Sequence, residues 1–140
     1  MDAQKINSLP DSVSPELLQM LFEDLVRNFN DNNIEKHKFF YILIELTDRQ
    51  VMTYEILEQN IKNEIDHILC QLWNTDSYED VDIILSVVVN LGLEECFKKI
   101  KSSLNQKVKI DQLILDEILE FIHEVGDHIA NPYYELEHLK

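Results

Sequence analysis

Residues 68–92 read ILCQLWNTDSYEDVDIILSVVVNLG, and this stretch decides the fold. It holds the end of one predicted helix, a polar turn and the most apolar predicted helix, and it contains no Lys or Arg. Asp76 and Ser77 are both residue types that cap helices, and Gly92 is typical of a helix end. The run 87–89 (VVV) has the composition of a strand, but apolar residues at helical spacing continue through it. We therefore expect a helix from this cap to Leu91.

Working outward, the same apolar spacing predicts helices on both sides of this stretch. Ser14 followed by Pro15 predicts one helix start, Thr53 and Asp111 predict two more, and Gly126 predicts a second helix end. The remaining predicted helices cover residues 15–30, 34–46, 54–73, 93–104, 112–125 and 132–139. Residues 1–13 are expected to be loosely ordered. With 2 Gly and 3 Pro in 140 residues, the sequence predicts one all-α domain over residues 1–140.

The charge of the chain is its strongest compositional feature. The formal net charge is −15, and residues 63–97 and 110–139 each hold eight acidic residues and no Lys or Arg. Such a surface repels phosphates, so we expect no direct nucleic-acid binding, and a basic protein is the natural partner. No apolar run is long enough for a membrane span. The sequence does not indicate an oligomeric state.

The two cysteines, Cys70 and Cys96, lie inside helical apolar patterns. A disulfide framework needs more cysteines, placed in loops of a shorter chain. The N-terminus is polar and lacks the apolar segment of a signal peptide. We therefore expect two buried free thiols and a cytoplasmic location.

The two glycines predicted to end helices, Gly92 and Gly126, are about 34 residues apart. A period of this size is typical of helical solenoids, whose units bury their apolar faces against neighbours. Trp73, then Tyr78-Glu79-Asp80, then an apolar helix ending at Gly92, resembles HEAT-like immunity proteins of bacterial toxin systems. The turn at Gly126-Asp127, followed by Ala130, is similar to the turn between the helices of a HEAT repeat. The predicted fold is therefore a HEAT-like helical solenoid or a right-angled stack of about seven helices. The resemblance also implies a cytoplasmic inhibitor that binds a cognate toxin.

Catalytic and metal-binding patterns are weak. Glu-x-x-His spacing occurs at Glu64/His67, Glu120/His123 and Glu135/His138, but the first two pairs point away from the apolar stripes of their helices. Phosphate-loop, nucleophile-elbow and zinc-protease motifs are absent from the sequence. We expect no enzyme activity, no cofactor and no metal.

Two acidic patches are the predicted partner-binding residues. Four carboxylates of the 112–125 helix fall within an arc of about 100° opposite its apolar stripe. Like charges four residues apart destabilise a helix, and no lysine offsets them. The other patch lies at the start of the 78–91 helix, where two of its members also suit helix capping. The predicted residues are Asp76, Glu79, Asp80, Asp82, Asp116, Glu117, Glu120, Glu124 and Asp127.

Three hypotheses follow from the sequence. The first is an immunity protein that occludes a basic toxin, such as a nuclease, with carboxylates in the place of phosphate. The second is a helical scaffold or adaptor that presents an apolar groove to a peptide or regulatory protein. The third is an enzyme whose site has no recognised motif. Alternatively, the acidic surface serves only to keep the protein in solution. Trp73 is expected to be a core residue that closes the corner between two helices. Alternatively, it is exposed and anchors an interface with a partner.

Overall fold

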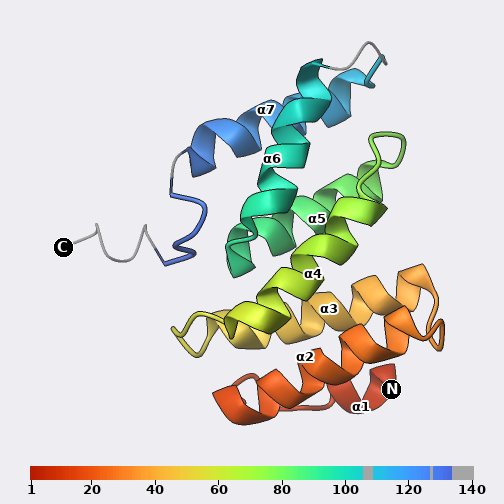
Figure 1. Ribbon diagram of the computed structural model, residues 1–140, viewed down its shortest axis with the longest axis vertical. Coiled ribbons are helices and arrows are strands. Elements are labelled where there is room, and N and C mark those ends of the chain that lie inside the picture. Colours follow the sequence, from red (N-terminus) through yellow and green to blue (C-terminus); the bar gives the residue numbers. More distant parts are fainter. Residues whose placement is uncertain (106–108, 127, 134–140) are drawn as a thin grey trace. The chain divides into compact units, whose positions relative to one another are not determined.

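A computed structural model confirms the all-α class: the described residues, 1–105, 109–126 and 128–133, form helices and no strand (Figure 1). The chain divides into two compact units, residues 1–64 (unit 1) and 65–140 (unit 2). The prediction of one domain over residues 1–140 stays a prediction. The helices are α1 (Ala3–Asn7), α2 (Pro15–Asn30), α3 (Lys36–Val51), α4 (Gln59–Leu72), α5 (Tyr78–Leu91), α6 (Glu94–Ser102), the 3₁₀ turn η1 (Ser103–Asn105) and α7 (Gln112–Val125).

In unit 1, α2 and α1 both pack against α3 (Figure 1). Helix α2 has its predicted bounds, because the Ser14 hydroxyl accepts the Leu17 N–H at 3.2 Å and proline occupies the first helical position. The rings of Phe29 and Phe39 join α2 to α3, with centroids 4.5 Å apart. The fully buried side chains of these two helices include Leu18, Phe22, Leu25, Phe39, Ile42, Leu43 and Leu46.

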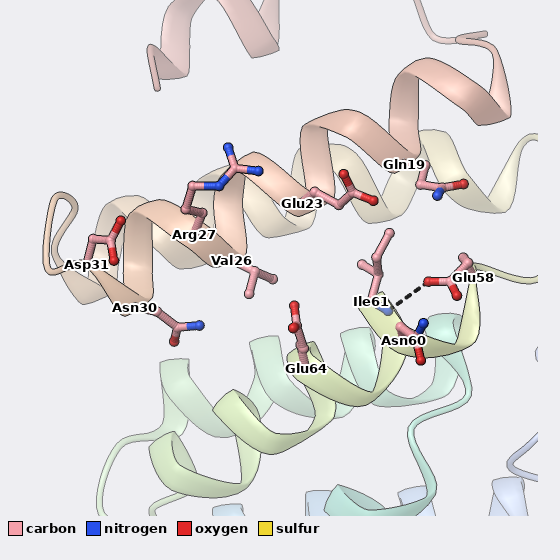
Figure 2. A pocket seen from close by; sticks show the side chains of 10 residues that line it. All are labelled: Gln19, Glu23, Val26, Arg27, Asn30, Asp31, Glu58, Asn60, Ile61 and Glu64. Carbon is pink, nitrogen blue, oxygen red and sulfur yellow. Dashed lines mark hydrogen bonds between the residues drawn. The ribbon is translucent and has the colours of Figure 1, made fainter.

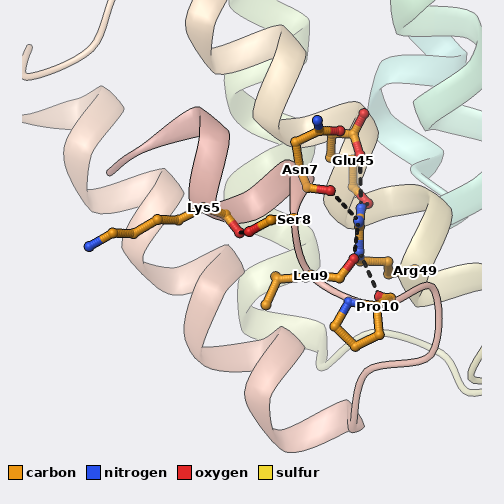
Figure 3. A network of polar contacts seen from close by, with 7 residues as sticks. All are labelled: Lys5, Asn7, Ser8, Leu9, Pro10, Glu45 and Arg49. Atoms are coloured by element: carbon orange, nitrogen blue, oxygen red, sulfur yellow. Dashed lines mark hydrogen bonds and ion pairs between the residues drawn. The ribbon is translucent and has the colours of Figure 1, made fainter.

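The N-terminal residues are held in place, whereas the sequence predicted a loose start. The chain forms α1, and Arg49 on α3 binds the last residue of α1 and the segment that follows (Figure 3). Its guanidinium donates to the carbonyl oxygens of Leu9 at 2.8 Å, Pro10 at 3.1 Å and Asn7 at 3.4 Å. The same group pairs with the Glu45 carboxylate at 2.9 Å. Arg49 is 5% exposed, so these bonds form away from solvent.

The connection after α3 differs from the prediction. Helix α3 begins at Lys36 and runs to Val51, beyond the predicted end at residue 46. Thr53 caps no helix: its hydroxyl donates to the Gln50 carbonyl at 2.7 Å and accepts the Glu55 N–H at 3.1 Å. Tyr54 takes a left-handed φ of 58°, which turns the chain away from helical geometry.

Helix α4 therefore begins at Gln59, several residues later than predicted. The Glu58 side chain, immediately before it, accepts the Ile61 N–H at 3.1 Å. A carboxylate at this place satisfies a helix-start amide and favours the helix dipole.

In unit 2, α5 forms as the quoted stretch predicts. Ser77 is its N-cap and accepts the Asp80 N–H at 3.3 Å. Val87 and Val88 are buried within the helix, so the helical interpretation of this run is confirmed. Gly92 ends α5 with φ of 72°, and a Cβ there would lie 2.9 Å from the Ile129 carbonyl oxygen. Glycine is required both for the backbone angle and for the close approach.

The start of α6 is capped by a distant residue. Its own N-cap, Leu93, offers no side-chain hydrogen bond. Asp66 on α4 supplies the acceptors instead: one carboxylate oxygen accepts the Cys96 N–H at 2.7 Å and the other accepts the Glu95 N–H at 3.0 Å. Asp66 is buried, and this role explains a charged group inside unit 2.

Helix α7 packs against α5 and α6 with a face rotated from the predicted one. The apolar spacing of residues 112–125 predicts an inward face of Leu115, Ile118, Ile122 and Val125. Ile118 and Val125 are buried as predicted, but Leu115 and Ile122 are half-buried. Ile114 and Phe121 are buried instead. The centroid of the Phe121 ring lies 5.7 Å from that of Phe97 on α6, so Phe121 lies on the face of α7 that contacts α6. The predicted helix 132–139 falls largely outside the described residues. Its first two residues lie in a turn.

Candidate protein-binding surface

Helix α7 presents a row of carboxylates to solvent. Glu120 and Glu124 are exposed and Glu117 is half-buried, all at the i, i+3, i+7 spacing of one helix face. Asp116 is exposed beside them and accepts a hydrogen bond from Gln112 at 2.8 Å. The predicted α7 patch therefore faces solvent, except for Asp127, which lies outside the described residues.

The start of α5 meets this row. The Tyr78 hydroxyl on α5 donates a hydrogen bond to the Glu117 carboxylate at 3.1 Å. Asp82, one turn along α5 from Tyr78, is exposed. The two predicted acidic patches are thus adjacent within unit 2, and the sequence contains no local signal for this contact. The surface formed by Tyr78, Asp82, Leu113, Asp116, Glu117, Glu120 and Glu124 is called the acidic face below.

The negative potential of the acidic face acts on Tyr78. The hydrogen bond to Glu117 raises the pKa of Tyr78, and the charges of Glu117 and Asp82 add to the increase. A phenol beside carboxylates keeps its proton because tyrosinate would add a further negative charge. Among the described residues, the carboxylates of the acidic face form no ion pair with Lys, Arg or His.

Asp80 is a correction to the predicted set. It is 3% exposed, and one of its carboxylate oxygens lies 3.4 Å from the Asn74 side-chain amide that donates to it. Asp80 and the buried Ile84 are four residues apart, so both lie on the inward face of α5. Asp80 therefore belongs to the folded interior. Asp76 and Glu79 remain at the start of the helix, and both are exposed.

The acidic face contains an apolar side chain that the sequence analysis missed. Leu113 is 67% exposed and lies four residues before Glu117 and seven before Glu120 on α7. Helical spacing places it among the carboxylates. The sequence does contain a signal for this exposure, because the positions of Leu113, Glu117 and Glu120 place all three on one side of the helix, away from the buried stripe. An exposed leucine surrounded by acidic groups is a suitable contact for a protein partner, because burying it releases water from apolar surface.

Glu124 also borders a small cavity of about 170 Å³ at the end of α7. Its walls are mostly apolar and include Phe121 and Val125. Trp73 lies elsewhere in unit 2, after the end of α4, and is 9% exposed. Its position agrees with the expected core role and leaves no large exposed ring for an interface anchor.

The Glu-x-x-His pairs do not gather as metal ligands. Glu64, His67, Glu120 and His123 are all exposed, and Glu135/His138 lies outside the described residues. Within the described part of the chain, one group of three ligand-type side chains converges, namely Asp66, Cys70 and Cys96. Cys96 is buried and Cys70 half-buried, and both are free thiols.

A polar cavity of about 590 Å³ lies between α2 and the first turns of α4, within unit 1 (Figure 2). Figure 2 shows Glu64, Glu58 and Asn60 from the start of α4 opposite Glu23 and Gln19 from α2. The Glu58 carboxylate is engaged at the α4 start, and the Arg27 guanidinium pairs with Asp24 at 2.7 Å. These contacts are those of a solvated polar surface, and we assign no ligand to it.

Comparison with known proteins finds no matching family model, curated protein or solved structure. Among the described residues, no helix combines the length and the apolar content needed to cross a membrane.

Proposed function

We propose that this chain is a non-catalytic binding protein that captures a basic protein partner through the acidic face. The observation that carries the proposal is the exposed carboxylate row of α7, joined to α5 by the Tyr78–Glu117 hydrogen bond. The specific form of the proposal is a HEAT-like immunity protein that occludes the site of a cognate toxin, such as a nuclease. Acidic groups on a rigid helix take the place of substrate phosphates against Lys and Arg.

The acidic face is costly for folding, which supports a role outside folding. Glu120 has Asp116 four residues before it and Glu124 four residues after it, and like charges at this spacing destabilise a helix. A surface that served solubility alone would mix signs at no such cost. Carboxylates in this arrangement speed the encounter with a positively charged partner, which an inhibitor of a lethal enzyme requires.

The adaptor hypothesis expects an apolar, concave surface. The cavity of about 590 Å³ in unit 1 is lined mainly by polar and charged side chains. The cavity of about 170 Å³ near Glu124 has mostly apolar walls but is smaller than a typical ligand pocket of roughly 300–1,000 Å³. The exposed carboxylates therefore favour the inhibitor over the adaptor.

The test uses the product of the open reading frame beside the gene for this chain as the candidate toxin. Its C-terminal domain is expressed with and without the chain, and growth and association kinetics are measured. We expect growth to be rescued and the association rate to fall steeply with added salt. Glu120→Lys combined with Glu124→Lys is expected to lower the association rate about tenfold at low salt.

The control is Glu16→Lys combined with Glu23→Lys, two exposed positions on α2 that give the same change in net charge. This variant should keep most of the association rate, because its charges lie outside the acidic face. If the two double variants lowered the association rate equally, the net charge of the chain, and not the acidic face, would account for the rate. A salt-independent rate, or no binding, would reject the inhibitor proposal.

A further inference from the structure

Three metal-ligand side chains meet inside unit 2. Asp66 and Cys70 are four residues apart on α4 and therefore project from the same side of the helix. Cys96 comes from the first turn of α6. The carboxylate oxygen and the two sulfur atoms all lie within 4.8 Å of one another. Cysteine sulfur and carboxylate oxygen are both zinc ligands, and this spread is compatible with closure around one ion.

We propose that Asp66, Cys70 and Cys96 form a binding site for a single Zn²⁺ ion, with a fourth coordination position open to water or an added ligand. Three protein ligands leave such a site open, in contrast to the four ligands of closed structural zinc sites. The site is separate from the acidic face, and the inference does not rest on partner binding.

The carboxylate is already oriented. The backbone N–H groups of Cys96 and Glu95 hold the two oxygens of Asp66 at 2.7 and 3.0 Å. Hydrogen bonds of this kind fix a ligating carboxylate and reduce the freedom it loses when a metal binds. The same two bonds tie α4 to the start of α6, so Cys96 is held beside Cys70 by the cap itself.

The charges balance when zinc binds. The metal-free set holds one carboxylate and two neutral thiols. Binding breaks two S–H bonds, forms two Zn–S bonds and releases two protons to the buffer. Two thiolates add two negative charges and the ion adds two positive charges, so the set keeps its charge. The N-terminal end of α6, a helix of 9 residues, faces the same net charge before and after binding.

A disulfide is the competing fate of two neighbouring thiols. Its formation removes two electrons and needs an oxidant, whereas binding of a metal ion does not. A metal ion brings the positive charge that stabilises both thiolates together. Cys70 is half-buried, which gives the ion an approach from solvent.

The test is a titration of the reduced, metal-free full chain with Co²⁺, a spectroscopic substitute for Zn²⁺. We expect saturation at one ion per chain, thiolate-to-cobalt charge-transfer absorption, and reversal by added Zn²⁺. Cys70→Ala is expected to lose the charge-transfer band while keeping its helical circular dichroism, because Cys70 is the less buried thiol. The matched control is His67→Ala, which removes an exposed ligand-type side chain from the same helix and should leave the titration unchanged.

A titration without thiolate absorption in the wild-type chain would overturn the proposal. Full binding by Cys70→Ala, or loss of binding in His67→Ala, would place the metal elsewhere and overturn it as well. The mass of the untreated chain distinguishes the alternative, because an internal disulfide lowers the mass by two hydrogens. If the untreated chain contains the disulfide and the reduced chain binds no Co²⁺, the two cysteines form a redox pair and the metal-site proposal is wrong.

Discussion

The two units differ in the sign of the charges that hydrogen bonds hold inside the fold. Unit 1 buries a cation, Arg49, and consumes its donors on backbone carbonyls and on Glu45. Unit 2 buries two anions, Asp66 and Asp80, and each accepts hydrogen bonds inside the fold. The carboxylates of the acidic face, in contrast, point to solvent without an ion pair among the described residues. The buried cation of unit 1 ties the N-terminal segment to α3. The carboxylates of the acidic face in unit 2 have no ion-pair partner in the described part of the chain.

The difference shows that the number of charged residues in a helix does not tell whether a given charge stabilises the fold. Nothing in the composition of α3 distinguishes Arg49. Its structural role comes from the N-terminal carbonyl groups to which it donates hydrogen bonds. Glu120 lies in the acidic face, and its exposed side chain has a carboxylate four residues before it and another four residues after it. Substitutions at these positions test the comparison directly.

The largest effect is expected for Arg49→Ala. The change leaves the carbonyls of Leu9 and Pro10 and the Glu45 carboxylate without their donor, and breaking a buried charged network costs about 3 kcal/mol. Urea unfolding measures the loss. Arg27→Ala is the control, because its ion pair with Asp24 is exposed and is expected to change stability by about 0.5 kcal/mol or less. Equal losses for the two variants would contradict the structural role of Arg49.

A smaller effect of opposite sign is expected for Glu120→Gln. The substitution keeps the shape of the side chain and relieves its repulsion with Asp116 and Glu124, so the chain gains about 0.5 kcal/mol. Thermal unfolding at low and high salt measures the gain, which should shrink as salt screens the charges. A loss of stability would show that Glu120 has a partner inside the fold and would remove the contrast between the units.

The smallest effect concerns Tyr78. Its folded-state pKa is raised by Glu117, so its contribution to stability is present below the unfolded-state pKa of tyrosine and is lost as pH rises through the folded-state pKa. Glu117→Gln should lower the pKa of Tyr78 toward its ordinary value. Ultraviolet titration of the tyrosines in the wild-type chain and in the Glu117→Gln variant detects the shift, with Tyr78→Phe identifying the signal. An unchanged titration curve would show that α5 and α7 do not meet at this point in solution.

Local chemistry made several elements predictable. Ser14 and Ser77 cap helices through bonds to amides three residues away, and Gly92 ends α5 through its own backbone angle. Such signals need no knowledge of the rest of the fold. The same reasoning failed at Thr53, because its side chain closes a turn with Gln50 that competes with helix capping.

The sequence by itself determined the all-α class, the bounds of α2, the cap and end of α5, and the exposure of most of the acidic residues. Only the tertiary structure decided that Asp80 is buried, that Asp66 caps α6 beside two thiols, that Arg49 holds the N-terminus, and that Tyr78 meets Glu117. The physical reason is the range of the interactions. Caps and apolar spacing act within one or two helical turns, whereas the last three contacts join residues about 30 to 40 positions apart, whose meeting depends on which helix faces pack together.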